Sequence, residues 1–153
     1  MLKIYNIKDK QEYIEEVAFL TQKEWGQKNL SANDFNTKVQ NKINKIKNNL
    51  NNKYYCKLIL LRGSTLIGFI SIFEHDEDSK PELFPWYATM FVKSEFRGNG
   101  YSKILNKAIL KEAKERGFKK IYLKTDLTNY YEKFGAQFLE NLNNKEKIYF
   151  FDL

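Results

Sequence analysis

The sequence is poor in the residue types that build disulfide frameworks and membrane spans. Its one cysteine, Cys56, cannot form a disulfide framework, and because it lies in an apolar run we expect it to be buried. No apolar run approaches the ~18 residues that a membrane-spanning helix needs. The N-terminal stretch MLKIYNIKDK lacks the apolar core of a signal peptide. We therefore expect a soluble, cytoplasmic protein that holds no metal and does not enter a membrane.

Arginine is also scarce, although the chain is basic. The formal net charge is +7, but only Arg62, Arg97 and Arg116 are arginine, and every other basic residue is a lysine. Arginine is the side chain preferred for bidentate recognition of phosphates and bases. We therefore do not expect a nucleic-acid-binding protein, although a basic surface attracts polyanions through long-range electrostatics.

The composition is typical of a globular protein, and the sequence predicts both strands and helices. Hydrophobic residues make up 42% and aromatic residues 16% of its 153 residues, which is enough to bury the core of one domain. The apolar patterns predict strands at residues 2–7, 54–61, 66–73, 87–92, 120–125, 137–140 and 147–151. No internal repeat or linker interrupts them. We therefore expect a single α/β domain over residues 1–153, with a mixed, twisted central sheet flanked by helices.

Helices are predicted where apolar residues recur at helical spacing between suitable end signals. The first helix follows Asp9 and Glu12, whose spacing is that of a capping box, and ends near Trp25. The second follows a cap signal at Ser31. The third ends at Gly117, because glycine is the residue typical of a helix C-terminus.

Residues 85–110 join an apolar strand to the third helix through a glycine-bearing turn. The strand is apolar without strict alternation, which is typical of a strand buried on both faces. The turn, RGNGYS at residues 97–102, presents unpaired backbone N–H groups at the positive end of the helix dipole, so it is suited to bind an anion. Its spacing fits neither the dinucleotide fingerprint nor the P-loop. An ordinary strand-to-helix turn is the alternative interpretation.

The turn resembles the signature loop of the GNAT superfamily of acetyl-CoA-dependent N-acetyltransferases, which holds the pyrophosphate of coenzyme A. Arg97, Gly100 and Ser102 stand at the three signature positions. Ser102 departs from the usual glycine or alanine but is small enough to keep the tight turn. The resemblance implies that acetyl-CoA is bound by Phe91, Val92, Arg97, Gly98, Asn99, Gly100, Tyr101 and Ser102.

A second segment strengthens this resemblance. Residues 130–136, YYEKFGA, look like the superfamily's aromatic-Tyr-Glu-Lys-x-Gly-Phe segment, and they follow the turn after one helix and one strand. The resemblance implies that Tyr131 lies near the sulfur of coenzyme A and acts as a general acid. The alternative is a short amphipathic helix whose aromatic side chains only pack. Two motifs in the superfamily's order favour the catalytic interpretation.

The resemblance also implies an architecture, the acyl-CoA N-acyltransferase fold. In that fold the strands at residues 87–92 and 120–125 run parallel and splay apart. The pantetheine arm lies in the gap and pairs with the backbone near Phe91 and Val92. The loop between the first two helices, residues 25–33, is then expected to form a wall of the acceptor site.

The sequence defines the acceptor and the general base less well. The acidic patch at residues 74–78 with Glu82 is either a solvated loop or a feature that draws a cationic amine towards the site. His75 lies among these acids, so we expect it to be solvated and not to act as a base. The strand at residues 86–92 has no carboxylate where some superfamily members place a glutamate. A water relay and a substrate that arrives neutral therefore both stay open.

These observations leave several functions open. The leading one is an enzyme that transfers an acetyl group from acetyl-CoA to a primary amine of a small molecule or peptide, by direct attack on the thioester and without a metal. A second uses an RNA-linked amine such as charged transfer RNA, which the basic surface favours and the shortage of arginine weakens. A third is a noncatalytic acyl-CoA-binding regulator, against which the presence of Tyr131 argues. We expect a monomer or a homodimer.

Overall fold

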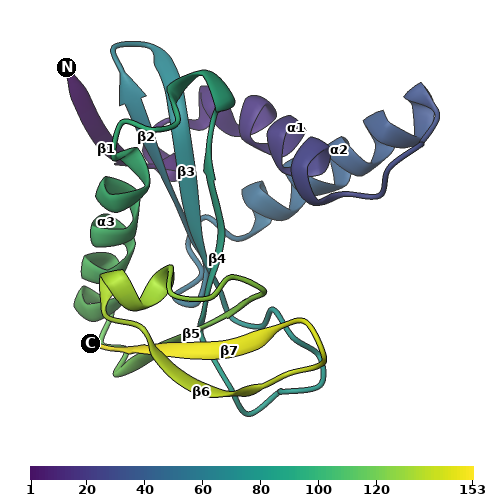
Figure 1. The fold of residues 1–153 in the computed structure, drawn as a ribbon. Coiled ribbons are helices and arrows are strands. Elements are labelled where there is room, and N and C mark those ends of the chain that lie inside the picture. Colours follow the sequence, from purple (N-terminus) through teal and green to yellow (C-terminus); the bar gives the residue numbers. More distant parts are fainter.

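The computed structural model describes residues 1–153 and contains one seven-stranded sheet with helices on both faces (Figure 1). The strands, in the order β1-β2-β3-β4-β5-β7-β6, are β1 Leu2–Asn6, β2 Cys56–Arg62, β3 Thr65–Phe73, β4 Trp86–Val92, β5 Lys120–Thr125, β6 Gln137–Asn141 and β7 Lys147–Asp152. The helices are α1 Ile14–Trp25, α2 Ala32–Asn48 and α3 Tyr101–Glu115. None of them combines the length and apolar composition required to cross a membrane. The predicted α/β fold with a mixed sheet is confirmed.

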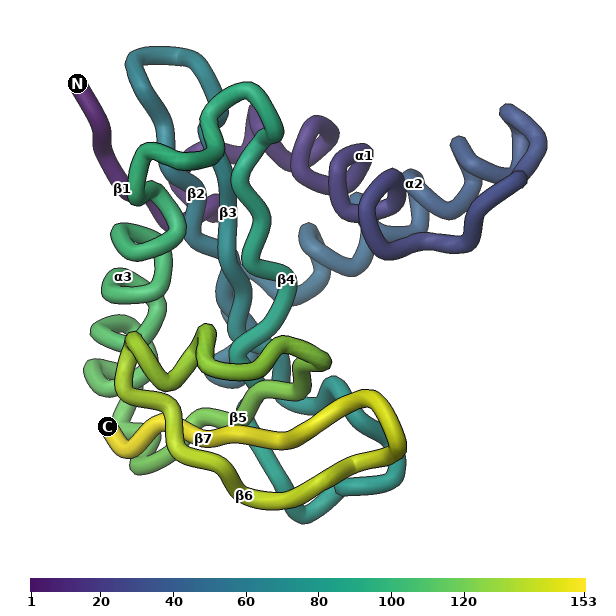
Figure 2. The backbone as a smooth tube through the Cα atoms, in the orientation of Figure 1, coloured from purple at the N-terminus to yellow at the C-terminus, as the bar shows by residue number.

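Each face of the sheet buries its own apolar core. On one face lies α3, whose residues Leu105, Ile109 and Ala113, spaced four apart, are all fully buried. On the other face lie α1 and α2, which contribute Val17 and Ile43 among others (Figure 2). Burying a large aliphatic side chain contributes about 1.5–3 kcal/mol. These two layers therefore hold the helices against the sheet and fix where their ends lie.

The helix ends follow some of the predicted signals and not others. The Ser31 hydroxyl accepts a hydrogen bond from a first-turn N–H of α2 at 3.1 Å, as predicted. Gly117, with a φ of 88°, follows the end of α3, also as predicted. The predicted capping box at Asp9 and Glu12 is wrong. Two short 3₁₀ turns occupy that stretch and α1 begins only at Ile14, because the turns carry Ile14 into the core, where it is 1% exposed.

The sheet splits between β4 and β5. These strands are parallel, and a single residue pair, Trp86 with Tyr122, keeps them in register. The Tyr122 N–H donates to the Pro85 carbonyl at 3.0 Å, and beyond this point the strands diverge. The splay that the resemblance implied is therefore present, and it leaves backbone groups of both strands without a ladder partner.

The β4 strand also carries a bulge, which lies beyond Trp86 and therefore beside the gap. Its register with β3 shifts between Phe69 and Ser71, and Thr89 has a φ of 47°, which is uncommon for a β-branched residue. Close backbone approach accompanies the bulge, because a Cβ at Gly68 of β3 would overlap the carbonyl oxygen of Phe91. The bulge or close approach predicted from Gly68 is thus observed.

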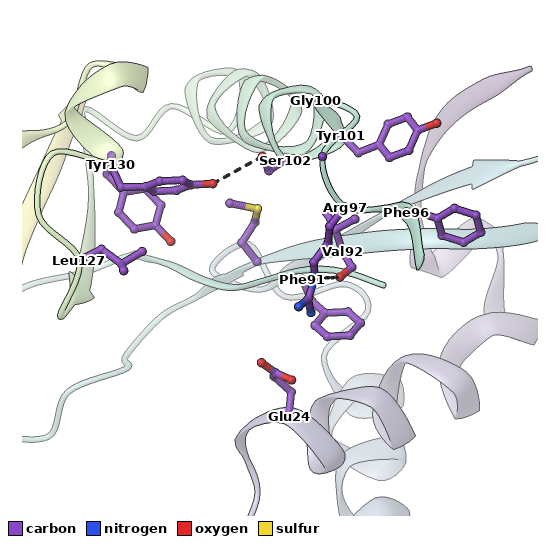
Figure 3. A pocket seen from close by; sticks show the side chains of 13 residues that line it. Glu24, Phe91, Val92, Phe96, Arg97, Gly100, Tyr101, Ser102, Leu127 and Tyr130 are labelled. Atoms are coloured by element: carbon purple, nitrogen blue, oxygen red, sulfur yellow. Dashed lines mark hydrogen bonds between the residues drawn. The ribbon is translucent and has the colours of Figure 1, made fainter. Parts of the chain in front are cut away.

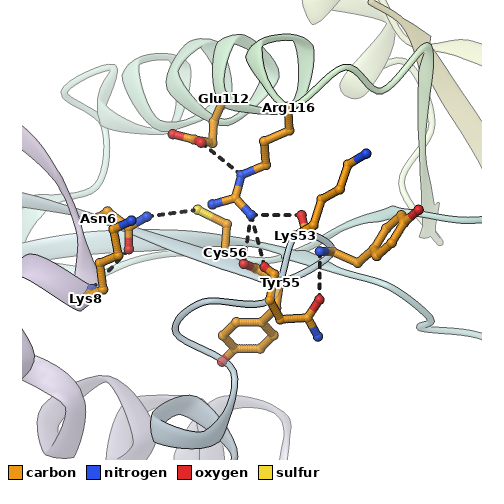
Figure 4. Close-up of polar contacts among 9 residues, drawn as sticks. Asn6, Lys8, Lys53, Tyr55, Cys56, Glu112 and Arg116 are labelled. Atoms are coloured by element: carbon orange, nitrogen blue, oxygen red, sulfur yellow. Dashed lines mark hydrogen bonds and ion pairs between the residues drawn. The ribbon is translucent and has the colours of Figure 1, made fainter.

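Arg116, just after α3, ties the helix to the segment that enters β2 (Figure 4). Its Nη1 donates to three backbone carbonyl oxygens within residues 52–55, at 3.2, 2.8 and 3.1 Å, and its Nε donates to Glu112 at 2.9 Å. The guanidinium thus satisfies acceptors that no strand ladder reaches. In the same region Cys56 is 2% exposed, as predicted. Burial raises the pKa of its thiol to about 12, so the thiol stays neutral and unreactive.

We expect Arg116→Met to lower the free energy of unfolding by about 1–3 kcal/mol, because the variant leaves backbone acceptors without partners. Chemical denaturation followed by circular dichroism would measure the change. The matched control is Lys111→Met on the same helix, where the ammonium lies 3.9 Å from Glu115 on the exposed surface. Its effect is expected to stay below ~0.5 kcal/mol. Equal effects of the two substitutions would contradict an anchoring role for Arg116.

Candidate functional site

The glycine-bearing turn adopts a conformation that leaves its N–H groups free. Gly98 and Gly100 have φ values of 80° and 78°, in the left-handed region that favours glycine. Gly100 is the N-cap of α3, which has neither a side-chain cap nor an acidic residue in its first turn. A Cβ at either glycine would meet nothing within 4 Å. The turn therefore offers open space in front of uncapped donors at a helix N-terminus, as an anionic ligand requires.

A cavity of ≈490 Å³ lies beside this turn (Figure 3). Eight of the nine residues named for the site from the sequence line it: Phe91, Val92, Arg97, Gly98, Gly100, Tyr101, Ser102 and Tyr131. The ninth, Asn99, does not. Its Nδ2 donates back to the carbonyl oxygens of Phe96 and Arg97, at 2.9 and 3.3 Å. Asn99 thus holds the shape of the turn from outside the cavity.

Two side chains of the turn are fixed by contacts within the protein. Arg97 donates from Nε to the Val92 carbonyl at 2.8 Å, and its guanidinium lies over the Phe91 ring at 5.6 Å from the centroid. Because Nε alone is engaged, the terminal guanidinium nitrogens keep their donors for a ligand. The Tyr101 hydroxyl accepts a hydrogen bond from Nη2 of Arg62, the last residue of β2. Arg97 is therefore suited to contact an anion, whereas Tyr101 anchors the start of α3.

Tyr131 is held by aromatic packing while its hydroxyl stays unengaged. Its ring packs edge-on against Tyr87 and Tyr130, at centroid distances of 5.7 and 4.8 Å. The Tyr87 hydroxyl in turn donates to Asn106 of α3 at 2.8 Å, which fixes that ring. Burial, with smaller contributions from Tyr130 and Asp126, raises the pKa of Tyr131 to about 12. The phenol therefore remains protonated throughout the physiological pH range and is available as a donor.

A second cavity, of ≈870 Å³, lies on the other side of Tyr131. Acidic side chains predominate among its charged groups: Glu24, Asp76, Asp126 and Glu146 face Lys124 and Lys145. Lys124 is partly neutralised, because its Nζ lies 3.1 Å from Glu77. Burial raises the pKa of Asp76. This lining is suited to a positively charged ligand.

The sequence anticipated only part of this second cavity. Asp76 of the acidic patch lines it, whereas His75 does not and instead packs against Phe84 at 5.9 Å between centroids. Of the predicted wall at residues 25–33, only Trp25 contributes. No cluster of three or more His, Cys, Asp or Glu side chains is arranged to hold a metal ion.

The two cavities meet at four shared residues, which are Glu24, Met90, Leu127 and Tyr131. Of these only Tyr131 was named from the sequence. Met90 lies in the middle of β4, next to the bulge, and its position in the predicted strand was the available signal. Glu24 and Leu127 come from the end of α1 and the loop after β5, and no local pattern marks them. A ligand in one cavity can thus reach a ligand in the other beside the Tyr131 hydroxyl.

Comparisons with known proteins identify relatives of this arrangement. Residues 11–136 match the model of the acetyltransferase (GNAT) family. The PaiA N-acetyltransferase of Thermoplasma acidophilum, solved with coenzyme A, is 21% identical with a TM-score of 0.66, over 100% of this chain and 99% of that one. A putative acetyltransferase of Salmonella typhimurium, YncA, solved with acetyl-CoA, is 12% identical with a TM-score of 0.68, over 99% and 92%.

A third structure, an acetyltransferase of Streptococcus agalactiae, is 16% identical with a TM-score of 0.67, over 99% of this chain and 98% of that one. At such identities the likeness shows a shared fold across the whole chain. No curated protein matches the sequence.

Proposed function

Because the chain belongs to the acetyltransferase (GNAT) family, we propose that it transfers an acetyl group from acetyl-CoA to a primary amine of a small molecule or peptide. The observation that carries this proposal is the meeting of two cavities at Tyr131, one beside an anion-binding turn and one with an acidic lining. A reaction between two bound substrates needs such a junction, because holding the reactants together supplies much of the rate enhancement.

The turn and β4 fit acetyl-CoA, which supplies an acetyl group already activated as a thioester. The uncapped N–H groups at the start of α3 and the free guanidinium nitrogens of Arg97 would hold the pyrophosphate. The side of β4 that faces the splay, near Phe91 and Val92, would hold the pantetheine arm, apart from the Val92 carbonyl, which Arg97 engages. These residues orient the thioester towards the second cavity.

Tyr131 would act on the sulfur of the leaving group. A thiol has an ordinary pKa near 8.5, whereas the pKa of Tyr131 is raised to about 12. Complete proton transfer from the phenol to the thiolate would therefore be unfavourable by several kcal/mol. We infer that Tyr131 stabilises the departing thiolate by donating a hydrogen bond, and that the thiol's final proton originates from the acceptor amine.

The acidic lining of the second cavity supports a cationic acceptor. Carboxylates concentrate a positively charged amine near the site and would repel a polyanion. The RNA-linked acceptor is therefore less well supported than a free diamine, an aminated sugar or a basic peptide. The carboxylates would bind a second ammonium group of such a substrate while the first one reaches Tyr131.

The test is calorimetric titration of acetyl-CoA into the protein, beside a thiol-release screen with diamines, monoamines of equal length, basic peptides and charged transfer RNA. We expect binding of acetyl-CoA and a lower KM for diamines than for monoamines, with the difference shrinking as salt screens the carboxylates. Binding without release of thiol on any acceptor would favour a noncatalytic regulator. Absence of binding by the folded protein would overturn the proposal.

A further inference from the structure

A lysine is buried in the sheet near the second cavity, which is called the acceptor cavity from here on because the amine is proposed to bind there. Lys57 is the second residue of β2 and is only 3% exposed. Its ammonium lies over the rings of Phe69 and Phe73 of β3, at 5.7 and 5.0 Å from their centroids, on the face that α1 and α2 cover. It forms no ion pair. A lysine seldom occupies such a position without a paired carboxylate, and packing alone gives no reason for an amine here.

The Lys57 amine begins a chain of hydrogen bonds that crosses three adjacent strands. Its Nζ is 2.7 Å from the Ser71 hydroxyl of β3, and Lys57 and Ser71 are direct cross-strand partners. The Ser71 hydroxyl is 2.6 Å from the Thr89 hydroxyl of β4, and either oxygen can be the donor. Hydroxyl groups that both accept and donate can pass a proton along such a chain.

The series of hydrogen bonds ends at the acceptor cavity. Thr89 lines that cavity, next to Met90 at its junction with the cofactor cavity. The bulge in β4 is the reason, because the shifted register and the positive φ of Thr89 let one residue face both Ser71 and the cavity. The strain of that backbone position is of the kind that persists at functional sites.

The surroundings of Lys57 favour its neutral form. Burial is the main cause, and the nearby ammonium groups of Lys45 and Lys42 on α2 act in the same direction, lowering the pKa of Lys57 from 10.5 to about 7. Cys56, beside it on β2, acts in the opposite direction. Asp76 lies near enough to Lys45 to feel its charge but is not among the groups that act on Lys57. A lysine with these neighbours can bind and release a proton near neutral pH.

We propose that Thr89, Ser71 and Lys57 form a proton relay that deprotonates the acceptor ammonium, in an inference that rests on the proposed function. The ammonium gives one proton to the Thr89 oxygen, the Thr89 proton passes to Ser71, and the Ser71 proton passes to the neutral Lys57 amine. The freed amine forms a bond to the acetyl carbon, the carbon–sulfur bond breaks, and the sulfur leaves with its electron pair. The second amine proton neutralises the thiolate.

The relay supplies the base that the carboxylate-free strand at residues 86–92 lacks. After each turnover the Lys57 ammonium returns its proton through Ser71 and Thr89 to water in the cavity. Only the Thr89 hydroxyl touches the substrate. Ser71 and Lys57 act through it, so they are positioning residues that orient this hydroxyl and store the proton.

The first test needs no acetyl transfer. In protein carrying ¹³C-labelled lysine, with Lys57 assigned by its loss in Lys57→Met, we expect the Lys57 side chain to titrate with a midpoint near 7. Lys45→Gln, on the exposed surface of α2, should move that midpoint upwards, because it removes a neighbouring positive charge. A midpoint near the ordinary 10.5 would overturn the relay whether or not the protein proves to be an acetyltransferase.

The second test is the pH dependence of kcat/KM for an alkylamine acceptor. Wild type should show a rising limb near pH 7, because Lys57 accepts a proton only above its pKa. In Lys57→Met the limb should move up to the pKa of the amine itself, and kcat at pH 7 should fall about 10²-fold. Thr89→Val should show the same change, and Thr89→Ser should largely restore the wild-type profile because it keeps the hydroxyl.

If Lys57→Met does not fold, Thr89→Val and Thr89→Ser still test the proton relay. A Thr89→Val enzyme with wild-type rate and profile would overturn the relay. Failure of the wild type to acetylate any amine would overturn the proposed function, and the relay as a catalytic device with it, while the lysine titration would still report whether the buried amine is poised to exchange a proton.

Discussion

Tyr131→Phe is expected to lower kcat by about 10²-fold while leaving the affinity for acetyl-CoA unchanged. The substitution keeps the ring that packs between Tyr87 and Tyr130 and removes only a hydroxyl with a pKa of about 12. Removing one preorganised hydrogen-bond donor to a charge that develops in the transition state typically costs about 10²–10³-fold in kcat. Single-turnover thiol release, together with calorimetric titration of acetyl-CoA, would separate chemistry from binding.

The neighbouring tyrosine provides a matched control. Tyr130 lines the cofactor cavity but not the acceptor cavity, and its hydroxyl lies 3.5 Å from Ser102. Tyr130→Phe removes the same atom one residue away. Because Tyr130 does not line the second cavity, we expect kcat to change by less than about threefold, which corresponds to less than ~0.6 kcal/mol of transition-state stabilisation. Full turnover by Tyr131→Phe, under conditions where chemistry limits the rate, would refute the role of Tyr131.

Gly100→Asp is expected to weaken acetyl-CoA binding by about 100-fold or more. The new carboxylate would lie beside the uncapped N–H groups of α3, where the pyrophosphate is proposed to bind. Two like charges about 4 Å apart repel by about 4 kcal/mol at an effective dielectric of about 20. A 100-fold change in Kd needs only about 2.7 kcal/mol, so this repulsion is sufficient. Isothermal titration calorimetry would measure the change.

Gly63→Asp controls for backbone strain. Gly63, in the turn between β2 and β3, also has a positive φ, of 58°, and a Cβ there also meets nothing within 4 Å. Both substitutions should therefore cost a similar amount of folding free energy, about 1–2 kcal/mol, while only Gly100→Asp should lose acetyl-CoA. If both variants bound acetyl-CoA as wild type does, the turn would not be the phosphate site.

Local sequence signals predicted the elements well where one signal dominated. The strand at residues 120–125 was predicted with its observed bounds, because its apolar alternation is bracketed by lysine and threonine. The capping box at Asp9 failed because a nearby apolar residue, Ile14, reached the core only through 3₁₀ turns. The splay at Trp86 left no trace in composition or periodicity, and only the resemblance to a family indicated it.

Local sequence signals likewise predicted one part of the candidate site and not the other. The glycine-bearing turn is contiguous in sequence, so its residues were predicted together, and all of them except Asn99 line the first cavity. The second cavity draws Glu24, Asp126 and Glu146 from segments far apart in the chain, and no spacing rule connects them. Lys57 is one of many lysines in the sequence, and no motif surrounds it. Its signal was a charged residue at an inner position of an otherwise apolar strand.

The splay between β4 and β5 also determines where the sheet places its free backbone groups. A strand edge with free N–H and C=O groups normally invites pairing with another chain and leads to aggregation. Here the bare edges beyond Trp86 and Tyr122 face each other inside the molecule, where α3 and Tyr131 flank the opening. The free N–H and C=O groups therefore lie between two inner strands of the sheet and not on its outer strands, β1 and β6. One divergence of two strands thus leaves free backbone groups without adding them to the outer edge of the sheet.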